Sequence, residues 1–157
     1  MNIKLMAVGK TDDKHLQALI DVYQKRLGHY IKFELDIIPD IKKAKNLSEE
    51  QQKQKEGALI LNKLQPTDML VLLDENGKQF SSVQFSDYLQ KRMNAGTKTL
   101  AFAIGGPYGF SKEVYSKAQG KISLSSMTFS HQMVRLFFIE QLYRAFTILK
   151  NEPYHHR

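Results

Sequence analysis

The chain has 157 residues, a length typical of one domain, and 42% of them are hydrophobic. It contains no cysteine, which excludes disulfides and thiolate metal sites, and no apolar run approaches the roughly 20 residues of a membrane span. The net charge is +7, from 23 Lys and Arg against 16 Asp and Glu. This charge fits a polyanionic partner such as nucleic acid, and it fits equally well a basic protein without one.

The first third of the chain predicts a strand, a helix and a second strand. Apolar runs cover residues 3–8, before a glycine, and residues 33–38, before a proline. Between them, residues 12–27 carry apolar side chains at helical spacing, namely Leu16, Leu19, Ile20, Tyr23 and Leu27. Asp12 or Asp13 can cap this helix, and we expect Gly28 to end it with a positive φ.

Residues 40–64 contain the most polar stretch of the chain, which is rich in lysine: Lys42, Lys43, Lys45, Lys53 and Lys55. We expect Ser48 to cap a helix that runs to about residue 64. A solvated helix face is the simpler interpretation of the lysines. A surface that contacts phosphates is the alternative.

The remaining elements continue the alternation of strands and helices. We expect strands at residues 69–73, 99–104 and 121–125, with the first of them ending in a turn at residues 74–77. The helices between them are expected to start at Ser82 and Ser111, and a long final helix runs from Ser130 to about Lys150. This order predicts an α/β domain with a mainly parallel sheet flanked by helices.

In such sheets ligands bind beyond the carboxyl ends of the strands. The strand ending at Ile104 leads into Gly105-Gly106-Pro107-Tyr108-Gly109, where the backbone is accessible to a ligand. The spacing is not that of a dinucleotide-binding loop, and a tight turn without a ligand remains possible. The next strand leads into hydroxyl groups that could bind an adenine or a ribose or could only cap a helix: Ser125, Ser126, Thr128 and Ser130.

The final helix is apolar nearly all round, which in a domain of this size indicates a subunit interface. Glu140 and Arg144 are spaced to form an ion pair on it. His131 and Arg135 share one face close to the hydroxyl-rich turn. The last residues, 154–157, form no regular pattern, so they are either a frayed end, a tag remnant or part of a site.

Together these residues resemble the RlmH family of SPOUT-class methyltransferases, which modify a pseudouridine of large-subunit ribosomal RNA. The resemblance covers the whole chain. It is carried by Ala7-Val-Gly9, Glu56-Gly57, Leu73 four residues before Gly77, Ile104-Gly105-Gly106-Pro107-x-Gly109, Met127-Thr-Phe-Ser-His131, Arg135, Glu140-Gln-x-Tyr-Arg-Ala145 and Tyr154-His155. Ser130 stands where many family members have proline, and a serine can cap the helix instead.

The resemblance implies a single SPOUT domain over residues 1–157, with a C-terminal trefoil knot. It implies S-adenosylmethionine as methyl donor, without a metal, and methylation of a pseudouridine at ring nitrogen N3. It also implies a cytoplasmic homodimer that packs through the final helix and acts on the assembled ribosome, away from membranes. The cofactor would lie beside Leu73, Gly105, Leu124, Ser125, Ser126, Met127, Thr128 and Phe129.

For catalysis, the hypothesis is that Arg135 orients the acceptor or stabilises its charge, and that Tyr154 and His155 form the acceptor pocket. His155 could take the proton of the imide nitrogen, because its unperturbed pKa lies near about 6.5. The tail of one subunit could complete the site of the other. Two rivals are a non-enzymatic RNA-binding dimer with the same basic surface and a doubly wound nucleotide-binding enzyme.

Overall fold

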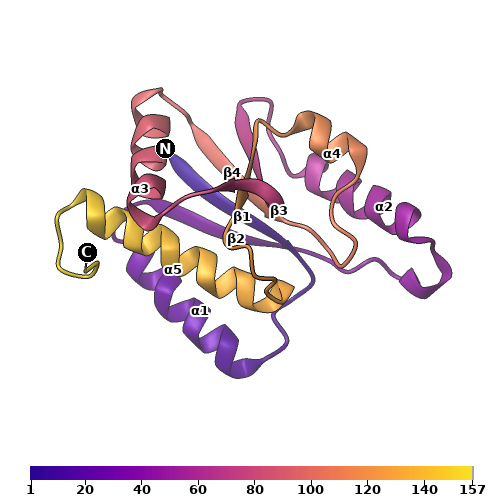
Figure 1. The fold of residues 1–157 in the computed structure, drawn as a ribbon. Helices are drawn as coiled ribbons and strands as arrows, with labels where there is room; N and C mark the ends of the chain where they lie inside the picture. The colour runs from indigo at the N-terminus through magenta and orange to yellow at the C-terminus, as the bar shows by residue number, and fades with distance from the viewer. Residues whose placement is uncertain (157) are drawn as a thin grey trace.

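In a computed structural model, which describes residues 1–156, the chain forms a five-stranded sheet with helices on both faces (Figure 1). The strand order is β2-β1-β4-β3-β5, and all four neighbouring pairs among these residues are parallel. The strands are β1 (Asn2–Val8), β2 (Lys32–Ile38), β3 (Asp68–Gln79), β4 (Thr99–Ile104) and β5 (Gly120–Ser123). The predicted α/β class is thereby confirmed, while Arg157 of the tail lies outside the described residues.

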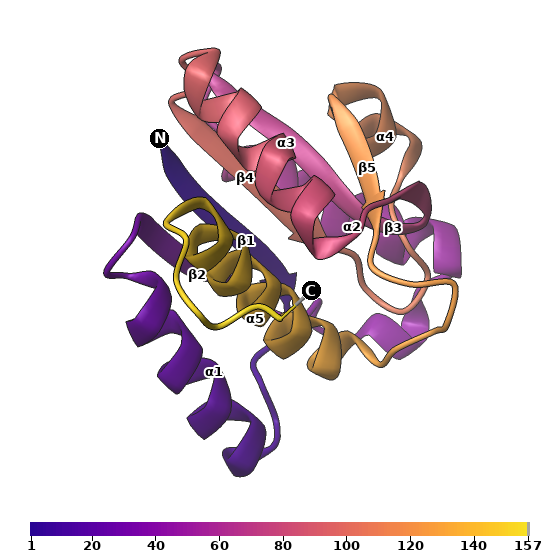
Figure 2. The same ribbon diagram turned by 60° about the vertical axis from the view of Figure 1, so that its left-hand side comes forward.

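The helices form two layers, one on each face of the sheet (Figure 2). They are α1 (Lys14–Leu27), α2 (Glu49–Asn62), α3 (Ser82–Asn94), α4 (Lys112–Lys117) and α5 (His131–Leu149), and a short 3-10 helix covers Ala44–Asn46. Helices α1, α3 and α5 pack on sheet residues such as Leu5 and Phe102. Helices α2 and α4 pack on the alternate residues, such as Met6 and Ala101. Burial on both faces explains why residues 5–8 of β1 and residues 100–104 of β4 are continuously apolar.

The predicted helix starts are largely confirmed. The carboxylate of Asp13 accepts hydrogen bonds from the backbone N–H groups of Leu16 and His15, and these bonds lower its pKa. Ser48, Ser111 and Ser130 cap α2, α4 and α5. One expected cap was wrong: Ser81 rather than Ser82 caps α3, because its hydroxyl reaches the backbone N–H of Gln84, whose side chain returns the bond.

Two glycine predictions need correction. Gly28 has a φ of −60°, since the chain continues from α1 through a right-handed turn, whereas Gly96 after α3 has a φ of +75°. The expected turn at residues 74–77 is a bulge within a longer β3, in which Leu73 and Lys78 both pair with Ile122 of β5. A Cβ on Gly77 would lie 2.6 Å from the backbone of Ile122, so a close approach explains this glycine.

Helix α5 lies across the sheet beside α1 and α3, and its inner face is fully buried (Figures 1 and 2). Its outer face also carries large apolar side chains, with Met133 and Phe137 each 37% exposed. Among the described residues, no helix is long and apolar enough to cross a bilayer. The position of α5 matters for function because its first turn borders a cavity at the end of the sheet.

Candidate functional site

A cavity of about 480 Å³ lies at the carboxyl ends of β3, β4 and β5, where the fold class predicts a ligand. We call it the strand-end cavity. Most of the predicted cofactor residues line it, namely Leu73, Gly105, Leu124, Ser125, Met127, Thr128 and Phe129. Ser126 is exposed between two lining residues and does not line the cavity itself. His131, at the start of α5, also lines it.

The glycine turn forms one wall of the strand-end cavity. Gly106 and Gly109 form a β-bridge in which the N–H of Gly109 donates to the carbonyl of Gly106 at 3.1 Å. Gly109 has a φ of +83°, which side chains rarely adopt, and a Cβ on Gly105 would lie 3.3 Å from the Gly109 backbone. The sequence left a tight turn and a ligand site as alternatives. The turn is tight, and it also lines the cavity.

The opposite wall is formed by the segment between β5 and α5, which its own side chains hold in place. The hydroxyl of Ser123 donates to the carbonyl of Ser125 at 3.0 Å. The hydroxyl of Ser125 accepts from the N–H of Met127 at 3.0 Å, and Ser130 caps α5. These bonds fix the backbone beside the cavity without a ligand.

A buried carboxyl group supports the glycine turn from behind. Glu56 of α2 is only 3% exposed, and its Oε1 has no hydrogen-bond partner among the described residues. A Cβ on Gly106 would lie 2.4 Å from Glu56 Oε2, so the carboxyl group fills the space that a side chain would need. Burial raises the pKa of Glu56. The sequence reading named Glu56 but assigned it no role, since contact between α2 and the turn has no local pattern.

Arg135 does not line the cavity. Its side chain is buried, and it donates from Nη2 to the carbonyl of Val8 at 2.8 Å and from Nη1 to the hydroxyl of Thr11 at 3.2 Å. Burial lowers the pKa of Arg135, but a guanidinium keeps its charge in proteins. His131 and Arg135 therefore do not form one site, although we expected them to share a face. The imidazole of His131 is exposed at the cavity, whereas the guanidinium of Arg135 is buried and binds the end of β1.

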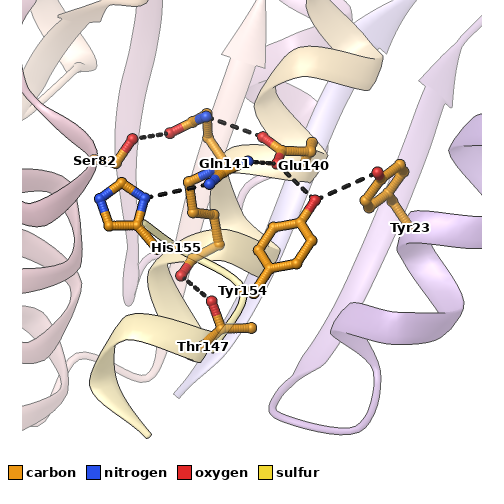
Figure 3. Close-up of polar contacts among 8 residues, drawn as sticks. Tyr23, Ser82, Glu140, Gln141, Thr147, Tyr154 and His155 are labelled. Carbon is orange, nitrogen blue, oxygen red and sulfur yellow. Dashed lines mark hydrogen bonds and ion pairs between the residues drawn. The ribbon is translucent and has the colours of Figure 1, made fainter. Parts of the chain in front are cut away.

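The tail residues are held by Glu140 in the middle of α5 (Figure 3). The Glu140 carboxylate accepts from Arg144 Nη2 at 2.6 Å, as the spacing predicted, and from the Tyr154 hydroxyl at 2.9 Å. The Tyr154 hydroxyl also lies 3.4 Å from that of Tyr23. Burial and these hydrogen bonds raise the pKa of Tyr154, so the phenol stays neutral. Residues 154 and 155 are thus packed, and the frayed-end interpretation is wrong for them.

The partner of His155 constrains its protonation. Its Nδ1 lies 3.2 Å from Nη1 of Arg144, and a guanidinium only donates hydrogen bonds. In a neutral His155, Nδ1 therefore accepts and Nε2 carries the proton. In this arrangement the imidazole can donate a hydrogen bond to a carbonyl oxygen, while its accepting nitrogen is already occupied. The geometry therefore argues against His155 as the proton acceptor.

One chain does not bring all the predicted catalytic residues together. Arg144, which holds His155, follows Arg135 by nine residues of α5, a rise of roughly 13 Å at 1.5 Å per residue. Neither Tyr154 nor His155 lines the strand-end cavity. Within a single chain, Arg135 thus lies near the start of the helix, and the tail packs against its middle and second half.

A second space connects the cavity with the residues that hold the tail. This aromatic hollow, of about 380 Å³, shares Ile122, Ser123, Leu124 and Phe129 with the strand-end cavity. At its other side Ser82 donates to Gln141 at 2.7 Å, and Gln141 donates to Glu140 at 2.9 Å (Figure 3). Glu140 therefore contacts the tail and also lines a hollow that leads to the cavity.

At the rim of the cavity, the sequence pointed to the end of β3, but it gave no role to Asp74 and did not indicate Tyr115 of α4. Asp74 and Tyr115 line the strand-end cavity, and the Tyr115 hydroxyl donates to the Asp74 carboxylate. Burial and this bond raise the pKa of Tyr115 to about 12. Tyr115 lies on the short helix α4, and no sequence pattern there indicates a binding site. Among residues 1–156, no cluster of three or more His, Asp or Glu side chains could hold a metal ion.

Residues 1–155 match the model of the family described as predicted SPOUT methyltransferases. The chain is 75% identical over 157 residues to a ribosomal RNA large subunit methyltransferase H from Flavobacterium johnsoniae, covering all of both chains. Relatives with the same name from Flavobacterium psychrophilum and Christiangramia forsetii are 76% and 73% identical, again over the full length of both chains.

The fold is an α/β sheet with a cavity where such sheets bind ligands, and the family match identifies the class of protein as methyltransferase. The chain belongs to the SPOUT methyltransferase family. Membership implies the C-terminal trefoil knot expected from the resemblance. It also shows that the doubly wound nucleotide-binding alternative was wrong.

Proposed function

We propose that the protein uses S-adenosylmethionine to methylate N3 of a pseudouridine in large-subunit ribosomal RNA, on the assembled ribosome. The observation that carries this proposal is the strand-end cavity, in a chain 75% identical over its full length to a ribosomal RNA large subunit methyltransferase H. A ribosomal substrate would place the protein in the cytoplasm. We also propose that residues 1–157 act as one domain, since both core clusters share the single sheet.

The residues of the strand-end cavity fit S-adenosylmethionine. Its volume of about 480 Å³ lies in the range of small-molecule sites, roughly 300–1,000 Å³. The wall at Gly105 and Gly109 has no side chains, so a ligand can approach the backbone closely. Asp74 and Glu75 place carboxylates at the rim, which suits a cationic sulfonium. When bound, the cofactor supplies the methyl group, and no metal is needed.

Bound S-adenosylmethionine would supply the methyl group, and the acceptor must release the proton of N3 to solvent or to a base for the methyl group to be accepted there. The main task of the protein is therefore orientation, which can contribute about 7–11 kcal/mol. We assign Arg135 to stabilising the developing imidate through its charge, from behind the cavity wall. Tyr154 and His155 form the acceptor pocket, with His155 donating from Nε2 to a base carbonyl.

This assignment requires a dimer, because the tail packs away from the cavity of its own chain. An apolar face suited to an interface runs across α1 and α5, with Leu19 48% and Val22 43% exposed on α1 beside Met133 and Phe137 on α5. The two helices lie side by side in both views (Figures 1 and 2). We propose that this face forms the homodimer interface and that each tail completes the partner's site.

Mass spectrometry of ribosomal RNA from a deletion strain, with and without the gene restored, tests the function. The proposal predicts one methyl group that is lost and then regained on a pseudouridine of the large-subunit RNA. Unchanged RNA in the deletion strain would refute it. Calorimetry with S-adenosylmethionine separates the enzyme from a non-enzymatic RNA-binding dimer, because only the enzyme has a reason to bind the cofactor.

A further inference from the structure

A third space lies between α3 and the sheet edge formed by β3 and β5. This basic groove has a volume of about 460 Å³. Its lining combines cations with aromatic and polar side chains, including Lys78, Phe80, Tyr88, Lys91, Arg92 and Lys121. Since β5 is the last strand of the sheet, the groove opens at the edge of the molecule.

Two of its cations lie over aromatic rings. Nζ of Lys78 is 5.1 Å from the centre of the Phe80 ring, and Cζ of Arg92 is 5.0 Å from the centre of the Tyr88 ring. Both rings are half-buried and so are fixed in the wall of the groove. Single-stranded nucleic acids bind to grooves of this composition, in which cations contact phosphates and rings stack with bases.

Among residues 1–156, no ion pair neutralises the cations of the groove. The ion pairs formed among residues 1–156 are Lys53–Glu50, Lys63–Asp36 and Arg144–Glu140, and all of them lie elsewhere. Asp87 is the acidic residue among those that line the groove. The balance is positive, and Lys78 and Lys91 are both exposed. A polyanion can therefore bind there without displacing an internal partner.

The basic groove is continuous with the proposed reaction site. It shares Phe80 and Ile122 with the aromatic hollow, and the hollow shares Ile122 and three further residues with the strand-end cavity. The three spaces thus follow one another along β5. A chain of nucleotides with one base near the cavity could extend into the groove on the same side of the sheet.

We propose that the basic groove binds the sugar–phosphate backbone of unpaired ribosomal RNA next to the modified nucleotide. Lys53 and Lys55, two of the five lysines that the sequence offered as phosphate contacts, lie on α2 at the opposite face of the sheet and do not take part. This inference rests on the proposed function for the identity of the RNA. The groove itself is assigned from its charge, its rings and its continuity with the cavity.

The test compares two double variants of equal charge, Lys78→Gln with Lys91→Gln in the groove and Lys45→Gln with Lys55→Gln on the α2 side. Binding to isolated ribosomes and to a fluorescent single-stranded RNA is measured against salt concentration. The groove variant should bind about tenfold more weakly, since it loses two exposed ionic contacts. Its log–log salt slope should fall by about 0.7–0.9 for each lost phosphate contact. The α2 variant should bind like the parent protein.

Equal binding by the two double variants would overturn the groove assignment. An equal loss of affinity for poly-L-glutamate and for RNA would also overturn it, because the surface would then be a general cation patch or a site for acidic protein. Failure of the proposed function gives a different result. The parent protein would transfer no methyl group to ribosomes, while the groove variant could still lose RNA affinity relative to its control.

Discussion

The two halves of α5 border regions that are held together in different ways. At its start, the strand-end cavity is built from backbone: a glycine turn closed by its own bridge and a serine segment bonded to itself. Along its second half, the tail is held by side chains that converge on Glu140 in the middle of the helix. Substitutions in the cavity wall disturb the backbone directly, and few of them remove a charge. The cluster at Glu140 instead depends on the charge and hydrogen bonds of each side chain in it. The comparison predicts that cofactor binding and acceptor chemistry can be separated by mutation.

The largest expected effect follows from removing the tail. A chain truncated after Glu152 should lose methyl transfer by about 10²-fold or more, because losing the residues that position the acceptor can cost that much, while S-adenosylmethionine still binds. Single-turnover kinetics and calorimetry measure the two properties. His156→Ala, at an exposed neighbouring position, is the control and should remain active. A truncated enzyme with full activity would show that the tail has no part in catalysis.

A methyl group added to the glycine turn should weaken the binding of S-adenosylmethionine, which the truncation of the tail leaves intact. Gly106→Ala places a Cβ 2.4 Å from Glu56, and such overpacking costs about 1–3 kcal/mol, or roughly 5- to 150-fold in affinity for S-adenosylmethionine. Calorimetry measures the affinity, and Gly28→Ala is a control because its φ of −60° suits alanine. Adding Glu56→Ala to Gly106→Ala should restore part of the affinity. No restoration would contradict the steric explanation.

A smaller effect is expected at Glu140, between the two ends. Glu140→Gln keeps an oxygen for Tyr154 but removes the charge that pairs with Arg144. A charged hydrogen bond contributes about 1.5–3 kcal/mol, so kcat should fall by about tenfold or more. The affinity for cofactor should stay the same. Glu50→Gln, which breaks an exposed ion pair on α2, should leave kcat unchanged. A weaker cofactor affinity in the Glu140 variant would show that the strand-end cavity and the tail cannot be separated by mutation.

The smallest effect concerns stability against pH. Burial raises the pKa of Glu56 above its unfolded value, so the folded state favours the protonated form. Stability should therefore fall as the pH rises from the unfolded pKa through the folded pKa. Glu56→Gln removes this loss, so its Tm relative to the parent should increase from pH 4 to pH 7. A difference in Tm that does not change with pH would mean that Glu56 titrates normally.

The fold class and part of the lining of the strand-end cavity could be predicted from the sequence, because runs of apolar residues and capping serines are local patterns. The site at Ile104 and Leu124 followed from one general rule about parallel strands. Contacts between distant segments could not be predicted in this way. Glu56 behind Gly106, Tyr115 on Asp74 and Arg135 on Val8 join residues far apart in the chain, and each depends on how the layers pack.

The bulge in β3 decides which layer its side chains face. Leu73 and Lys78 are five residues apart, so in a regular strand they would point to opposite faces of the sheet. Because both pair with Ile122, the four residues between them reverse this alternation, and both side chains face the layer of α3 and α5. One strand thus lines the strand-end cavity with Leu73 and the basic groove with Lys78 on the same side of the sheet. A strand without the bulge would separate them by the thickness of the sheet.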